Sequence, residues 1–127
     1  MKKEKFHIEY IFDTVSQRSL WKHLTTSSGL SSWFAQEVTI NERTYTFRWE
    51  KDEQQANVLA QKYESSIRYQ WTDEEDPNAY FEFIIHRIEL TGSTALEITD
   101  FAEPGDKADA INLWDTQVDE LKRTLGI

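Results

Sequence analysis

Cysteine is absent from this chain of 127 residues, and proline, glycine and methionine are scarce. Without cysteine, structural disulfides, thiolate chemistry and cysteine-ligated zinc sites are excluded. A chain of this length buries about two thirds of its unfolded surface on folding, so its hydrophobic core can stabilise it without a covalent or metal cross-link. We therefore expect one domain over residues 1–127, folding in a reducing compartment.

Long apolar segments are also missing. No run approaches the roughly 20 apolar residues that a membrane-spanning helix needs. The segment from Phe6 to Tyr10 alternates between apolar and polar residues, whereas a signal peptide has a continuous apolar segment. These absences predict a cytoplasmic protein that does not insert into membranes.

Positive charge is in the minority, with 14 basic against 23 acidic side chains and a net charge of −9. A negative domain repels phosphate backbones and anionic lipid head groups, which argues against nucleic-acid binding and against binding to a membrane surface. The charge either keeps the protein soluble or attracts a basic partner.

Alternation of apolar and polar residues predicts most of the secondary structure as strands. Phe6, Ile8 and Tyr10 alternate with polar residues, which predicts a strand over residues 5–13. The same pattern predicts six further strands, over residues 37–41, 44–50, 54–65, 66–72, 80–89 and 94–102. In the strand over 80–89, Ile84 and Ile88 interrupt the alternation, which favours a bulge or a central position in the sheet.

Helices are predicted at two places. After the first strand, residues 15–25 and 30–35 form two short helices separated by Ser27-Ser28-Gly29, and Thr14 with Gln17 forms a capping pair at the start of the first. A long helix over 106–125 carries one apolar stripe, made of Ile111, Trp114, Val118, Leu121 and Leu125.

These elements predict the α+β class. Each strand and the last helix have one apolar face, and the economical arrangement wraps a curved antiparallel sheet of six to seven strands around the long C-terminal helix. A curved sheet and a single helix need not close fully, so an apolar cavity is expected between them. The charged strand residues Arg48, Arg68, Glu82 and Glu97 have the opposite parity and are predicted to form cross-strand pairs on the convex face. No inward-facing charge is predicted.

Patterns typical of catalysis or metal binding are missing. His7, His23 and His86 lack metal-ligand spacing and are interpreted as surface or capping residues, and no nucleophile elbow or glycine-rich phosphate loop is present. The acidic run over 73–76 lacks the spacing of a calcium loop and is interpreted as a solvated hairpin tip. We therefore predict no catalytic residue, no metal and no cofactor.

Aromatic residues are the best functional lead. Eight of them lie at inward positions and are predicted to line a cavity: Trp33, Phe34, Trp49, Tyr69, Trp71, Phe81, Phe83 and Trp114. Tyr69 or an indole N–H could then orient the polar end of a ligand. The competing interpretation is that the same rings fill a solid core, and sequence does not separate the two.

The chain resembles the START-like superfamily, and within it the branch similar to the activator of Hsp90 ATPase. The matching segments are the first strand with Thr14-Val15-Ser16, then Leu20-Trp21-Lys22-His23-Leu24-Thr25, Leu30-Ser31-Ser32-Trp33-Phe34, and Leu113-Trp114 with Leu121-Lys122. The resemblance implies the helix-grip fold. It also implies that the chain binds lipids or similar molecules, interacts with proteins as a co-chaperone, or is a cyclase or hydrolase.

Three hypotheses follow, in order of support. The first is a non-enzymatic domain that binds a small hydrophobic molecule in the cavity. The second is a protein-interaction module of the co-chaperone kind. The third is an enzyme of the cyclase or hydrolase type, which would require a titratable side chain in the cavity.

Overall fold

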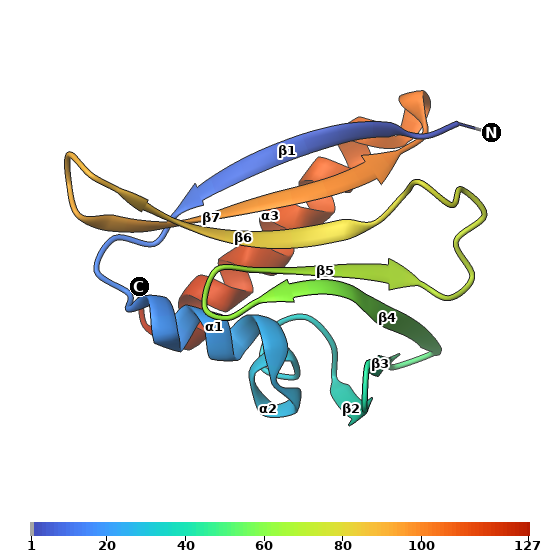
Figure 1. Ribbon diagram of the computed structural model, residues 1–127, viewed down its shortest axis with the longest axis horizontal. Helices are drawn as coiled ribbons and strands as arrows, with labels where there is room; N and C mark the ends of the chain where they lie inside the picture. Colours follow the sequence, from blue (N-terminus) through green and yellow to red (C-terminus); the bar gives the residue numbers. More distant parts are fainter. Residues whose placement is uncertain (1) are drawn as a thin grey trace.

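The computed structural model describes residues 2–127, which form seven strands, three α-helices and one short 3₁₀-helix (Figure 1). The strands are β1 (Glu4–Ile11), β2 (Glu37–Asn41), β3 (Thr44–Trp49), β4 (Asp52–Lys62), β5 (Ser66–Trp71), β6 (Phe81–Ile88) and β7 (Ser93–Ala102). The helices are α1 (Gln17–Thr25), α2 (Ser27–Leu30), η1 (Pro104–Asp106) and α3 (Lys107–Leu125). All seven predicted strands and the long helix are confirmed, with small shifts at their ends.

The strands form one antiparallel sheet in the order β1-β7-β6-β5-β4-β3-β2. The predicted alternation holds, since Tyr45 and Phe47 on β3 and Ile67 and Tyr69 on β5 are buried. β6 lies between β5 and β7, which explains its interrupted alternation by a central position. The register irregularity falls instead in β4, between Val58 and Ala60.

Helix α3 crosses the sheet on one side, as Figure 1 shows, and buries the predicted stripe against it. Trp114, Val118 and Leu121 are buried, while Ile111 and Leu125 pack at the edges of the core. The helix ends at Gly126, whose φ of 79° is a left-handed conformation that glycine adopts without strain. The α+β helix-grip prediction is therefore confirmed. None of the helices in residues 2–127 is long and apolar enough to span a membrane.

The two short helices differ from their predicted bounds. Ser16, not Thr14, caps α1, because its hydroxyl accepts a hydrogen bond from the Ser19 amide. The predicted break at Ser27-Ser28-Gly29 is wrong, since these residues form α2, which Thr26 caps by accepting from the Gly29 amide. A Cβ at Gly29 would lie 2.1 Å from the Lys22 carbonyl oxygen, so only glycine permits this close packing of α2 on α1.

The C-terminal end of α1 is bound by three side chains from other segments. The carbonyl of His23 accepts from the Trp33 indole at 2.7 Å, that of Leu24 from the Tyr69 hydroxyl at 2.7 Å, and that of Thr25 from the Tyr45 hydroxyl at 2.8 Å. The last carbonyls of a helix lack intrahelical partners, so these bonds satisfy them and attach α1 to the sheet.

The charged strand residues pair on the convex face as predicted. Arg48 contacts Glu37 at 2.9 Å and Glu53 at 3.0 Å, and Arg68 contacts Glu82 at 3.0 Å. Most of these side chains are exposed to solvent, so each pair contributes little to stability.

Candidate ligand-binding site

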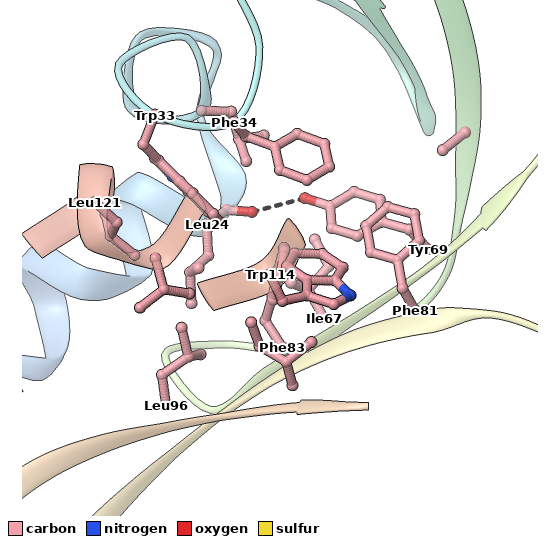
Figure 2. Packing of buried hydrophobic residues seen from close by; sticks show 14 of the residues in the cluster. Leu24, Trp33, Phe34, Ile67, Tyr69, Phe81, Phe83, Leu96, Trp114 and Leu121 are labelled. Carbon is pink, nitrogen blue, oxygen red and sulfur yellow. Dashed lines mark hydrogen bonds between the residues drawn. The ribbon is translucent and has the colours of Figure 1, made fainter. Parts of the chain in front are cut away.

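The interface between α3 and the sheet is solid around the C-terminal half of the helix. Figure 2 shows Leu121 and Leu24 close to Leu96 and Phe83, with the Tyr69 hydroxyl donating to the Leu24 carbonyl. All five side chains are fully buried. This part of the interface is a packed core and offers no room for a ligand.

The N-terminal half of α3 leaves a cavity of about 250 Å³ against the sheet. Its wall combines aromatic rings from five segments with a few polar side chains: Phe34, Trp49, Gln54, Trp71, Phe81, Asp100, Ala110, Leu113, Trp114 and Gln117. We call it the helix–sheet pocket. Ala110 is short enough to leave space beneath the helix, and Leu113 at the opening is 62% exposed. The pocket therefore has an apolar interior with an opening to solvent.

Aromatic side chains pack closely around this pocket. The rings of Trp71 and Phe81 are 4.9 Å apart between centroids, those of Trp49 and Trp71 are 6.4 Å apart, and Phe34 stacks on Trp114 at 6.0 Å. Ring packing of this kind fixes the wall positions, since each ring is held by several neighbours. Trp49 and Trp71 remain partly exposed and present surface to the pocket.

Asp100 is the one titratable side chain that lines the helix–sheet pocket among the described residues. Its Oδ2 accepts from the Trp114 indole at 2.8 Å, and its Oδ1 accepts from the Phe101 amide at 2.8 Å. Burial raises the pKa of this carboxyl, although the hydrogen bonds from Trp114 and Phe101 and the charge of Lys3 act to lower it.

The prediction of no inward charge is wrong at this position. Asp100 continues the parity of Leu96 and Ile98 on β7, both fully buried, and its strand partner on β1 is the buried Phe6. That parity was visible in the sequence and would have placed the carboxylate on the concave face. Asp100 also lies close to the end of β7, however, and polar residues are common at strand ends that face solvent. The sequence therefore fits both positions.

A wider cleft of about 530 Å³ adjoins the pocket, and both are lined by Gln54 and Trp71. Carboxylates dominate its wall, from the loop after β5 and from the segment between β7 and α3: Asp73, Glu74, Glu75, Glu103 and Asp106. Lys3 is the only basic side chain among its lining residues, and its Nζ lies 2.8 Å from Glu74. The predicted solvated hairpin tip thus forms one wall of a cleft, which we call the acidic cleft.

Most of the polar groups proposed to orient a ligand already have partners. The Tyr69 hydroxyl donates to Leu24, and the indoles of Trp33 and Trp49 donate to the carbonyls of His23 and Phe34. Within residues 2–127, Trp71 is the pocket indole with no hydrogen-bond partner. Asp100 and the amides of Gln54 and Gln117 are the other polar groups available at the wall.

The eight aromatic residues of the predicted lining fall into three groups. Phe34, Trp49, Trp71, Phe81 and Trp114 border the helix–sheet pocket. Trp33 borders a shallow hollow of about 250 Å³ beside Gln36 and Glu120, which shares Phe34 and Trp49 with the pocket. Tyr69 and Phe83 are fully buried in the core and line neither of these two hollows nor the acidic cleft. A role in ligand binding remains a prediction for all eight.

A second polar cluster lies on the convex face, away from the helix–sheet pocket and the acidic cleft. Potential ligand atoms of Glu9, His86 and Glu97 lie within 4.8 Å of one another, and His7 Nδ1 is 3.5 Å from Glu97. These residues come from three adjacent strands, β1, β6 and β7. Spacing along the chain does not show such a grouping, which depends on strand order.

The comparisons with known proteins agree with this architecture. A model of the START-like superfamily domain matches residues 1–127. The chain is similar to the protein BfR322 from Bacteroides fragilis, with 43% identity, a TM-score of 0.71, and coverage of 100% of this chain and 94% of that one. No curated protein matches the chain.

More distant solved structures share the fold. The Aha1 dimer from Colwellia psychrerythraea has 20% identity, a TM-score of 0.77, and coverage of 100% of this chain and 98% of that one. Protein MLL2253 from Mesorhizobium loti has 16% identity, a TM-score of 0.76 and coverage of 96% of both chains.

Proposed function

Because this chain belongs to the START-like superfamily over residues 1–127, we propose that it binds a small, largely apolar molecule in the helix–sheet pocket. The observation that carries the proposal is the pocket itself, an opening walled by five of the eight predicted aromatic residues. Ligand sites are typically apolar hollows with a few placed polar groups, and Asp100, Gln54 and Gln117 are such groups.

Binding fits this geometry better than catalysis does. Acid–base or nucleophilic chemistry needs a reactive group with a partner that activates it. Asp100 has no second titratable side chain beside it in the pocket wall, and both of its oxygens accept hydrogen bonds. The cyclase or hydrolase hypothesis therefore has one candidate residue and no catalytic constellation.

The protein-interaction hypothesis has weaker support. The large apolar side chains exposed on the described surface come from separate segments: Ile11, Ile40, Leu59, Tyr63, Leu90, Leu113 and Ile127. Single exposed apolar residues are normal on a monomer. A salt-sensitive partner recovered by a variant with a filled pocket would favour this alternative.

The test of ligand binding is a thermal-shift and tryptophan-fluorescence screen with alcohols, sterols and aromatic molecules, since Trp49, Trp71 and Trp114 would report a ligand directly. The variant Ala110→Phe fills the space beneath α3 and should abolish the ligand-induced rise in Tm. The matched control Ala108→Phe adds the same ring at an exposed position of α3 and should bind as the unmodified protein does. Absence of binding to every molecule, or equal binding by both variants, would refute the proposal.

A further inference from the structure

The helix–sheet pocket combines an apolar wall with negative charge only. Asp100 is the charged side chain among its lining residues, and no basic side chain lines it within the described chain. A carboxylate at an apolar wall loses hydration, and an opposite charge nearby offsets that loss. The Trp114 indole and the Phe101 amide supply hydrogen bonds to Asp100 without supplying a positive charge. Lys3 acts on Asp100 from outside the pocket wall, and its ammonium is paired with Glu74.

The cleft that adjoins the pocket is negative as well. The acidic cleft has five carboxylates on its wall, and its one lysine, Lys3, is paired with Glu74. The whole chain carries a net charge of −9. A hollow lined by one sign of charge raises the local concentration of the opposite charge and lowers that of like charge. A fatty acid carboxylate is therefore disfavoured at this opening.

The tryptophans of the pocket also favour a positively charged ligand. Trp49, Trp71 and Trp114 line the pocket together, and the rings of Trp49 and Trp71 lie 6.4 Å apart. The face of an indole attracts cations, and groups of aromatic rings bind alkylated ammonium ions in this way. The same rings also provide an apolar wall for a hydrocarbon portion.

We propose that the ligand of the helix–sheet pocket is a cationic amphiphile, with an ammonium group held by Asp100 and the tryptophan faces and an apolar portion lying under α3. This inference rests on the proposed function, because it assigns the chemical class of the molecule that the same pocket binds. A neutral apolar ligand and an anionic one paired with Lys3 are the two alternatives.

Three probes with one octyl chain and different head groups separate these classes: octyltrimethylammonium, octanol and octanoate. Binding is measured by calorimetry and tryptophan fluorescence at neutral pH. We expect octyltrimethylammonium to bind at least about tenfold more tightly than octanol, with octanoate the weakest. Tighter binding of octanol or octanoate overturns the cationic assignment while the proposed function stands. Failure of all three to bind counts against both.

A pair of variants shows whether Asp100 or the surface charge is responsible. Asp100→Asn should weaken octyltrimethylammonium binding about tenfold and weaken octanol binding less, because octanol loses no opposite charge. Glu37→Gln removes the same charge from the exposed convex face, beside Arg48, and should leave both affinities unchanged. The melting curve of each variant confirms that it is folded.

Ionic strength provides a second readout. Attraction by the exposed carboxylates of the acidic cleft weakens as salt is added, whereas a contact with the partly buried Asp100 is screened less. The preference for the cation should therefore persist at 0.5 M salt. Equal losses in Asp100→Asn and Glu37→Gln, or loss of the preference in salt, would overturn the assignment.

Discussion

The two halves of α3 pack against the same sheet in different ways. Around the C-terminal half, Leu121 is fully buried among aliphatic and aromatic side chains from α1, β6 and β7. Around the N-terminal half, Leu113 is 62% exposed beside a pocket lined by Asp100 and partly exposed tryptophans. The difference teaches that one helix packs against the same sheet without a gap at one end and borders a pocket at the other.

The largest expected effect tests this division directly. Leu121→Ala should lower the free energy of unfolding by about 3 kcal/mol, because it leaves a cavity in a fully buried position. Leu113→Ala, the same change two helical turns earlier, should alter stability by less than about 0.5 kcal/mol. Urea unfolding followed by circular dichroism measures both. Similar losses in the two variants would show that the halves do not differ in packing.

A smaller effect is expected for the polar contact in the solid half. Tyr69→Phe removes the hydroxyl that donates to the Leu24 carbonyl and leaves that buried acceptor without its partner. The expected loss is about 1–2 kcal/mol in urea unfolding. Tyr63→Phe, at a side chain that is 73% exposed, is the matched control and should change stability little. An unchanged stability of Tyr69→Phe would mean that the carbonyl is satisfied by solvent.

The smallest expected effect is a gain in stability when the charge of Asp100, beside the N-terminal half of α3, is removed. Burial raises the pKa of Asp100, so folding favours its neutral form, and the ionised form costs stability once the pH exceeds the folded-state pKa. Lys3 and Glu74 also act on this group, with opposite signs. Asp100→Asn removes the charge and keeps an acceptor for the Trp114 indole, but its amide nitrogen cannot accept from the Phe101 amide, so the gain in stability at neutral pH should be small.

The pH dependence of this gain is its sharpest test. Below the unfolded pKa of aspartate both proteins carry a neutral side chain, so their free energies of unfolding should converge as the solution is acidified. The gain should grow as pH rises from the unfolded pKa to the folded-state pKa and level off above it. A gain that is constant with pH, or a loss of stability, would contradict the assigned cause. A variant that is more stable and binds cations less well would show that the charge serves binding.

Sequence reasoning predicts the sheet and α3 well because both follow from simple periods. The stripe from Ile111 to Leu125 and the alternation in β3 and β5 each determine a buried face. The bounds of α2 are harder to predict, because Ser27 and Gly29 read as a break. The Thr26 cap and the close approach of Gly29 to Lys22 hold them in a helix instead.

The candidate site is predicted only in part. Parity places aromatic rings on the concave face, and five of them border the pocket. Whether an aromatic ring is buried in the core or borders a pocket depends on its neighbours in other strands. For this reason Tyr69 and Trp71, which lie on the same face of β5, differ in exposure. The parity of β7 predicts that the Asp100 side chain points toward the concave face. Only the packing of α3 shows that it borders a pocket there and not bulk solvent.

The three hydrogen bonds at the end of α1 also make the two ends of the helix–sheet interface unequal in how easily they open. Because Trp33, Tyr45 and Tyr69 attach the carbonyls of His23, Leu24 and Thr25 to the rest of the fold, local opening at that end would break several buried contacts at once. In the described residues, no such hydrogen bond from α1 reaches the N-terminal end of α3. At that end Leu113 and the acidic cleft face solvent. We therefore expect the fold to open more readily at the first turns of α3 than at the α1 end.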